Sequence, residues 1–200
     1  RDATQPLRIE SLMTGSLEPT NTAYATAKLA GIQFCAAVRQ EHGLAWFAAI
    51  PSTLYGPEDH FDPAQAHVAT SLMIRMHQAK QQRLSVFSVW GTGTPRRDFL
   101  FSRDFADAAF FLAGHYDAAN GPINVGPDSD YSIAEVARMV QQVVGYEGRL
   151  EFDSTKPDGA PIKRLDASAL RSLGWQPKTG FVDGLRETYA AFLKQLPVGL

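Results

Sequence analysis

Pro19-Thr-Asn-Thr-Ala-Tyr-Ala-Thr-Ala-Lys28 is the stretch that decides the fold of this 200-residue chain, because it holds Tyr24 and Lys28 four residues apart. On a helix, that spacing places both side chains on one face, about one turn apart. A Lys ammonium so close to a phenol favours the phenolate and lowers the pKa of the Tyr from about 10. Such a Tyr can exchange a proton with a substrate hydroxyl or carbonyl near neutral pH. Most Tyr–Lys pairs with this spacing only share a solvated helix face. The neighbouring sequence is therefore needed to distinguish a catalytic pair from such a surface pair.

The segment that follows has the order expected of a helix, a buried strand and a ligand-binding loop. An Ala-rich helix, capped by Thr20 or Asn21, is predicted to end before Gly43. Residues 44–50 form an apolar run that is typical of a fully buried strand in a parallel sheet. The Pro- and Gly-containing residues 51–57 come next, and ligands of open α/β sheets bind at the carboxyl ends of strands. We therefore expect the ligand crevice beside this loop.

The rest of the chain alternates between helical and extended patterns, which argues for an α/β fold. A capping box of Ser132 and Glu135 begins one of the helices, and Gly91-Thr-Gly93 is typical of a turn. Helices are predicted at residues 64–82, 104–116, 132–144, 166–174 and 182–193, and strands at residues 84–90, 97–102, 122–126 and 149–153.

Composition limits the class of protein and its compartment. Hydrophobic residues make up 44% of the chain, and the net charge of −2 gives no reason to expect a nucleic-acid or membrane partner. The sequence has no apolar run long enough to span a bilayer. The single cysteine, Cys35, excludes an internal disulfide, suits a reducing cytoplasm and is expected to be a small buried hydrophobe. The sequence predicts no metal site.

Several segments, in a fixed order and spacing, resemble the extended short-chain dehydrogenases/reductases, and within that superfamily the GDP-L-fucose synthase family. Besides the Tyr24 helix and the loop after it, they are Gly15-Ser-Leu-Glu-Pro-Thr-Asn21, Tyr55-Gly-Pro-Glu-Asp-His-Phe-Asp-Pro63 with His67-Val68, Val89-Trp-Gly-Thr-Gly-Thr-Pro-Arg-Arg-Asp-Phe-Leu100, Ile123-Asn-Val-Gly126, Lys156-Pro-Asp-Gly-Ala-Pro161 and Leu173-Gly-Trp175. The resemblance implies the C-terminal part of a Rossmann-type doubly wound fold, together with a smaller α/β substrate-binding domain.

The resemblance also implies a division of the chain near residue 60. Residues 1–60 correspond to the C-terminal part of the dinucleotide-binding domain. Residues 61–200 correspond mainly to the nucleotide-sugar-binding region, with segments that return to the Rossmann sheet. The sequence lacks the glycine fingerprint that cradles a dinucleotide pyrophosphate, since Gly91-Thr-Gly93 has two glycines and no following helix. We therefore expect a C-terminal portion of such an enzyme, with the fingerprint, the catalytic Ser and the catalytic Cys before residue 1.

The implied activity is NADP-dependent epimerisation and reduction of GDP-4-keto-6-deoxy-D-mannose to GDP-L-fucose, by a cytoplasmic homodimer paired through the helix that bears Tyr24. Tyr24 would protonate the C4 oxygen as hydride reaches C4, and Lys28 would bind the nicotinamide ribose. Four residues would lie against the nicotinamide ring: Pro51, Ser52, Thr53 and Leu54. Thr53 stands where the family usually has Asn, so it offers a hydroxyl in place of an amide.

His67 matches the residue that the family uses beside the cofactor as a general acid for epimerisation at C3 and C5. An imidazole, with a reference pKa of about 6.5, suits that task. The alternative is a histidine that makes a local backbone bond at a helix start. His60 and Ala66 replace the family's Asn and Ser nearby. The other histidines are predicted to lie on helix surfaces: His42, His77 and His115.

Four further residues match substrate-binding positions of the family: Arg75, Trp90, Arg97 and Lys156. Guanidinium forks suit phosphate oxygens, although a single Arg more often lies on a solvated face. Arg97 should enter a strand directly after the Gly91 turn, with Arg96 pointing the other way. Ile162 stands where the family often has a second Arg.

Two alternatives to this function stay open. One is another NAD(P)-dependent nucleotide-sugar epimerase, dehydratase or reductase, although a plain 4-epimerase needs no acid such as His67. The other is a non-catalytic fragment that lacks the glycine-rich cofactor loop and only binds a nucleotide sugar or a partner. The upstream coding sequence would distinguish them.

Overall fold

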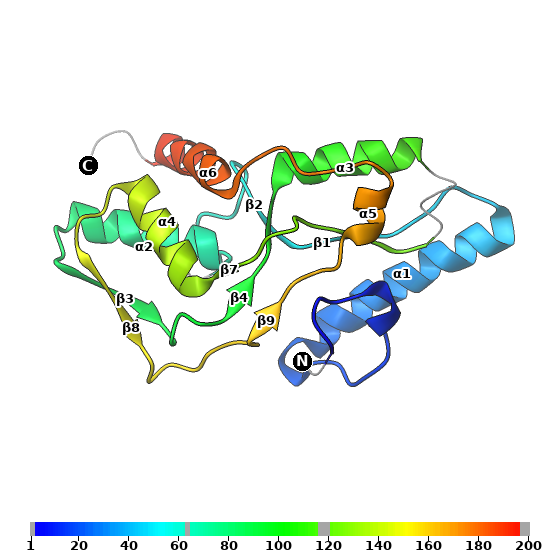
Figure 1. The fold of residues 1–200 in the computed structure, drawn as a ribbon, viewed down its shortest axis with the longest axis horizontal. Helices are drawn as coiled ribbons and strands as arrows, with labels where there is room; N and C mark the ends of the chain where they lie inside the picture. Colours follow the sequence, from blue (N-terminus) through cyan, green and yellow to red (C-terminus); the bar gives the residue numbers. More distant parts are fainter. Residues whose placement is uncertain (1–2, 63–64, 116–120, 197–200) are drawn as a thin grey trace.

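Short parallel strands in the middle of the molecule connect two groups of helices (Figure 1). The computed structural model describes residues 3–62, 65–115 and 121–196. The helices are α1 (Thr22–His42), α2 (Val68–Gln81), α3 (Ser102–Gly114), α4 (Ile133–Val144), α5 (Ser168–Ser172) and α6 (Phe181–Gln195), preceded by the 3₁₀ helices η1 (Ile9–Ser11) and η2 (Pro19–Asn21). The strands are β1 (Ala49–Pro51), β2 (Thr53–Tyr55), β3 (Val86–Trp90), β4 (Arg96–Arg97), β5 (Phe99–Phe101), β6 (Ile123–Val125), β7 (Tyr131–Ser132), β8 (Arg149–Asp153) and β9 (Ile162–Lys163).

β1 and β2 are two parts of one extended stretch that lies between two other strands. β1 pairs with β6 and β2 pairs with β5, both in parallel. Ser52 joins the two parts, and its backbone N–H donates to the carbonyl of Val125 at 2.9 Å. Because the stretch finds backbone partners along its whole length, it stays extended. The prediction of a loop at residues 51–57 is therefore wrong as far as Tyr55, and the turn begins at Gly56.

The strand predicted at residues 44–50 is displaced toward the C-terminus. β1 begins only at Ala49, and Leu44 and Trp46 are 48% and 45% exposed. The ring of Trp46 instead packs edge-on against Phe34 of α1, with ring centroids 5.9 Å apart. The prediction of a fully buried strand is wrong because, within residues 44–50, β6 offers backbone partners only to residues 48–50.

Hydrophobic clusters on either side of the strands hold the helices in place. The larger cluster joins α2, α4 and α6 to β2, β3 and β5, and Met73, Met76 and Val140 in its centre are fully buried. The smaller cluster joins α3 and α5 to β5 and β6, around Leu112 and Trp175. The sequence outside β1–β2 therefore supplies most of the core. Along the described residues, no helix is both long and apolar enough to cross a membrane.

Most other predicted elements are confirmed with small shifts. β8 has the predicted bounds, and α4 begins with the predicted capping box of Ser132 and Glu135. The strand predicted at residues 97–102 is divided at Asp98 into β4 and β5. The predicted boundary residues Ala64 and Tyr116 of two helices lie outside the described residues.

α1 ends where the sequence predicts, and Gly43 stops it in the left-handed region with a φ of 64°. None of its side chains is buried, and it lies at the margin of the molecule (Figure 1). Asn21 stands at the N-cap but makes no side-chain capping bond. Cys35 is half-buried, so the prediction of a fully buried thiol is wrong.

His77 departs from its predicted place on a helix surface. It is only 8% exposed, and its Nδ1 lies 2.9 Å from the hydroxyl of Tyr189 on α6. Its ring also meets Phe192 edge-on, with ring centroids 5.2 Å apart. Burial lowers the pKa of the His77 imidazole, and the charge of Lys80 lowers it further. The prediction is wrong because α6, far away in the sequence, covers this face of α2.

Gly184→Ala should destabilise the fold, because an added Cβ would overlap the Tyr55 hydroxyl and lie 2.9 Å from the Phe101 ring. We expect a loss of about 1–3 kcal/mol in the free energy of unfolding, the usual cost of overpacking. Gly31→Ala is the matched control, since nothing lies within 4 Å of its added Cβ. Urea denaturation followed by circular dichroism measures both variants. Equal stability of the two would contradict the packing described here.

The buried His77 should make stability depend on pH. Its folded-state pKa lies below the ordinary value of about 6.5, so the folded state binds fewer protons than the unfolded state. The stabilisation that neutral His77 gives is full at a pH above the ordinary pKa of about 6.5, and it is lost as the pH falls toward the folded-state pKa. Urea midpoints at pH 7.5 and pH 5.5 should differ less in His77→Gln than in the parent chain. His42→Gln, at an exposed position, should keep the parent's pH dependence.

Candidate active site

Tyr24 and Lys28 lie together on the first turns of α1, as their spacing predicts. The Lys28 ammonium lies over the face of the Tyr24 ring, 5.5 Å from its centroid. Tyr24 is 61% exposed, so its hydroxyl is accessible to a ligand. η2 leads directly into this turn, where the Thr22 hydroxyl donates to the carbonyl of Glu18 at 3.0 Å. The pair therefore places an accessible phenol beside a positive charge, and a phenol can donate or accept a proton.

The predicted nicotinamide-binding residues Pro51, Thr53 and Leu54 belong to the extended stretch, with Ser52 at its midpoint. The Ser52 Oγ is buried and has no hydrogen-bond partner among the described residues. A Cβ on Gly126 would lie 3.5 Å from this oxygen, so the backbone of that glycine runs close by. A buried hydroxyl without a partner is costly, and a ligand group that donates or accepts a hydrogen bond would satisfy it.

His67 lies at the N-cap of α2 and is exposed. Its side chain makes no capping hydrogen bond, so the alternative of a local helix-start bond is not what the structure shows for the imidazole. A neighbouring carboxylate holds this helix end instead: Asp59 accepts from the buried Thr70 hydroxyl and, at 2.8 Å, from the backbone N–H of His60. The imidazole of His67 is therefore left available for chemistry at the surface.

Arg75 and Trp90 form a second group of predicted residues. The Arg75 guanidinium lies 5.0 Å from the ring centroid of Phe87 and 5.6 Å from that of Trp90, and it donates to the carbonyl of Ser88 at 2.8 Å. Burial lowers the pKa of Arg75. Trp90 is 66% exposed, so a cation and an open aromatic face stand side by side.

Arg97 contacts the segment that contains Lys156, which makes a third group. Its Nη1 donates to the carbonyls of Arg96 and Ala160 at 2.6 and 2.8 Å. Burial lowers its pKa, while the neighbouring Asp98 opposes that effect. Arg96 points away and pairs with Asp130 at 2.6 Å, which confirms the predicted alternation.

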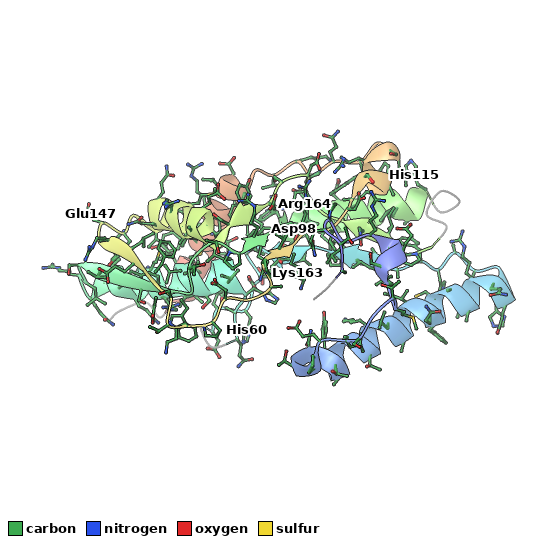
Figure 2. All side chains as sticks on the ribbon, turned by 60° about the horizontal axis from the view of Figure 1, so that its bottom comes forward. His60, Asp98, His115, Glu147, Lys163 and Arg164 are labelled. Carbon is green, nitrogen blue, oxygen red and sulfur yellow. The ribbon has the colours of Figure 1, made fainter. Side chains whose placement is uncertain are left out.

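Sequence reasoning did not single out Asp98, a carboxyl that is only 2% exposed. It lies in the middle of the molecule with Lys163 and Arg164 (Figure 2), and it accepts from the N–H of Leu165 at 2.8 Å. Burial raises its pKa. The signal in the sequence is an acid directly before the apolar run Phe99-Leu-Phe101, where a buried carboxyl needs a specific partner. Among the described residues, no cluster of metal-ligating side chains is present.

Comparison with known proteins places this chain in a family. The family model described as "NAD dependent epimerase/dehydratase family" matches residues 1–126. The GDP-L-fucose synthase of Sinorhizobium fredii is 46% identical over 97% of this chain and 62% of its own length. GDP-L-fucose synthase 1 of Arabidopsis thaliana is 47% identical over 97% of this chain and 60% of its own length. The chain thus spans about three fifths of these relatives.

Solved structures of related proteins share the fold of this chain. A GDP-6-OMe-4-keto-L-xylo-heptose reductase from C. jejuni superposes with a TM-score of 0.88 at 30% identity, over 97% of this chain and 67% of that one. A GDP-L-fucose synthetase from Naegleria fowleri bound to NADP gives 0.84 at 27% identity, over 96% and 62%. These likenesses confirm the predicted Rossmann-type α/β fold and the resemblance stated from the sequence. The chain belongs to the NAD dependent epimerase/dehydratase family.

Proposed function

We propose that this chain is part of an NADP-dependent enzyme that epimerises and reduces GDP-4-keto-6-deoxy-D-mannose to GDP-L-fucose. The observation that carries the proposal is the Tyr24–Lys28 pair, with the ammonium 5.5 Å from the centre of an exposed phenol ring. Relatives at 42–47% identity carry the name GDP-L-fucose synthase, which favours this activity over the other nucleotide-sugar enzymes and over a non-catalytic fragment.

The residues near Ser52 fit the nicotinamide end of the cofactor, because the unpartnered Ser52 hydroxyl would gain a partner from a carboxamide. Tyr24, Lys28 and His67 would hold the cofactor from their exposed positions, together with the backbone and side chains of the extended stretch at residues 51–54. Bound NADPH supplies a hydride to the substrate. The support from relatives includes a synthetase whose solved structure holds NADP.

The chain's own residues would move protons and hold the sugar nucleotide. Tyr24 gives a proton to the C4 oxygen, and the charge of Lys28 stabilises the phenolate that remains. After a base has removed the proton from C3 or C5, His67 returns a proton to that carbon from the other face, a task that suits an accessible imidazole. Cationic side chains bind the diphosphate, and the open ring of Trp90 offers a stacking surface for the nucleotide base. Three side chains supply the charge: Arg75, Arg97 and Lys156.

The arrangement of strands supports a division of labour between residues 1–60 and residues 61–200. The first part brings α1 and the β1–β2 stretch, which carry the cofactor side. The second part brings the substrate cations, and its strands β5 and β6 return to pair with β2 and β1. We also propose a cytoplasmic homodimer paired through α1, whose Phe34 is 60% exposed.

Tyr24→Phe should reduce turnover by about 10²–10⁴-fold, the usual contribution of a positioned acid. Because the chain spans about three fifths of its relatives, the assay uses a fusion to the N-terminal part of the Sinorhizobium fredii relative. NADPH oxidation with GDP-4-keto-6-deoxy-D-mannose is followed by absorbance. Gln40→Ala, another exposed position of α1, is the control and should keep full turnover. Normal turnover by Tyr24→Phe would refute the assignment.

His67→Gln in the same fusion should suppress epimerisation while leaving cofactor binding nearly intact, because Tyr24, Lys28 and residues 51–54 would still hold the cofactor. Solvent deuterium should no longer enter C3 and C5 of the sugar, because the glutamine amide cannot donate a proton as the imidazole does. NADPH fluorescence titration measures cofactor binding, and mass spectrometry of the sugar measures deuterium. Weakened NADPH binding with normal deuterium entry would show that His67 serves the cofactor alone.

A further inference from the structure

The segment of residues 153–161, which we call the Lys156 loop, is fixed at both ends by backbone hydrogen bonds. The carbonyl of Asp153 accepts from the N–H of Gly91 at 3.0 Å. The carbonyl of Pro161 accepts from the N–H of Arg96 at 2.8 Å. Between these points, residues 154–159 are exposed. The loop therefore has firm ends and a solvated middle, and Lys156 lies in that middle.

Asp158 fastens the middle of the loop to the turn at Gly91–Thr94. One carboxylate oxygen accepts from the backbone N–H of Thr92 at 2.9 Å, and the other accepts from the Thr92 hydroxyl at 2.7 Å. The Thr92 hydroxyl is itself held, because it lies 2.7 Å from that of Thr94 and accepts from the Thr94 N–H at 3.2 Å. Hydrogen bonds to an ionised carboxylate are stronger than neutral ones.

Two glycines make this close approach possible. Gly91 has a φ of 84°, and a Cβ there would overlap the Asp158 carboxylate. On the other side of the loop, a Cβ on Gly159 would lie 2.9 Å from Nη2 of Arg97. Arg97 also donates to the carbonyl of Ala160 at 2.8 Å. The loop is thus held between the turn and the Arg97 side chain.

These contacts also separate the charges of the loop. Because Thr92 occupies both oxygens of Asp158, that carboxylate is directed to the turn, although it is only two residues from Lys156. The backbone N–H of Lys156 donates to the carbonyl of Asp153 at 3.1 Å. Lys156 is three residues before Gly159, which lies against Arg97. Three residues of extended chain span at most about 10 Å, so the backbone of Lys156 lies within that distance of Gly159.

We propose that Asp158 is a positioning residue, which holds the Lys156 loop so that the Lys156 ammonium and the Arg97 guanidinium form one preformed diphosphate-binding pair. The proposal rests on the proposed function, in which these cations bind a nucleoside diphosphate sugar. A preformed pair improves affinity because the loop is already ordered before the ligand arrives. The Thr92 side chain is the partner through which Asp158 acts.

The first experiment tests the hydrogen bonds between Asp158 and Thr92 in the 200-residue chain. The amide of Thr92 reports on it directly, because that N–H donates to Asp158. In Asp158→Ala, hydrogen exchange at Thr92 and at Lys156 should become faster, about tenfold or more, because both hydrogen bonds from Thr92 to Asp158 are lost. Ser154→Ala, an exposed change in the same loop, should leave both rates unchanged. Unchanged exchange in Asp158→Ala would overturn the proposal.

The second experiment tests whether Asp158 affects ligand binding through Lys156. The probe is GDP, in calorimetric titration of the same chain. Lys156→Ala and Asp158→Ala should each weaken GDP binding about tenfold, the loss expected of one charge-assisted contact. In the Lys156→Ala background, Asp158→Ala should have no further effect. Thr92→Val keeps the backbone N–H bond to Asp158 and loses the hydroxyl bond, so it should weaken GDP binding less than Asp158→Ala does. Thr92→Ser, which keeps the hydroxyl, should keep the parent's affinity.

If the losses of GDP affinity from Lys156→Ala and Asp158→Ala add in the double variant, the proposal is overturned, because Asp158 would then not act through Lys156. A parent chain that does not bind GDP would overturn it as well. Failure of the proposed function looks different: the coupled GDP effects would remain, while the fusion protein would fail to oxidise NADPH with GDP-4-keto-6-deoxy-D-mannose.

Discussion

The Tyr55 side chain is the contact on which the arrangement of both halves of the site depends. Its ring lies 5.5 Å from that of Phe101 and 5.1 Å from that of Phe181, and its hydroxyl donates to the carbonyl of Phe181 at 3.2 Å. Burial raises the pKa of this phenol, so it stays a neutral donor. The end of β2 is thereby fixed to α6 and β5 at a point where Gly184 leaves just enough room. Aromatic contacts of this kind add to the stabilisation that area burial already gives.

Fixing the end of β2 determines where the chain goes on both sides of Tyr55. Upstream, the register with β5 and β6 places the unpartnered Ser52 hydroxyl beside Gly126. Downstream, the turn at Gly56 leads to Asp59, whose carboxylate holds the first turn of α2. Ser52 and His67, to which the proposed function assigns cofactor binding and proton transfer, are therefore positioned by one buried ring, and a shift of β2 would displace both.

Sequence reasoning succeeded where the structure is decided locally. The end of α1 follows from Gly43, and the start of α4 follows from the Ser132–Glu135 capping box. It failed where a distant element decides the outcome. Residues 44–48 have the composition of a buried strand, but strand pairing depends on β6, and the burial of His77 depends on α6. The grouping of Arg97 with the Lys156 loop likewise needs two segments about 60 residues apart, which spacing along the chain does not reveal.

The neighbouring residues Arg96 and Arg97 show how the fold separates charges that the sequence places together. On a strand they point to opposite sides, and Arg96 is neutralised by Asp130 at 2.6 Å and Glu135 at 3.4 Å. Asp130 and Asp128 also pair with Arg164 on that side. Among the described residues, Arg97 has backbone carbonyls as its hydrogen-bond partners and no carboxylate in ion-pair contact. Arg96 is thus paired with acids on one side of β4. The Arg97 guanidinium is held by backbone carbonyls on the other side, where an anionic ligand would meet it.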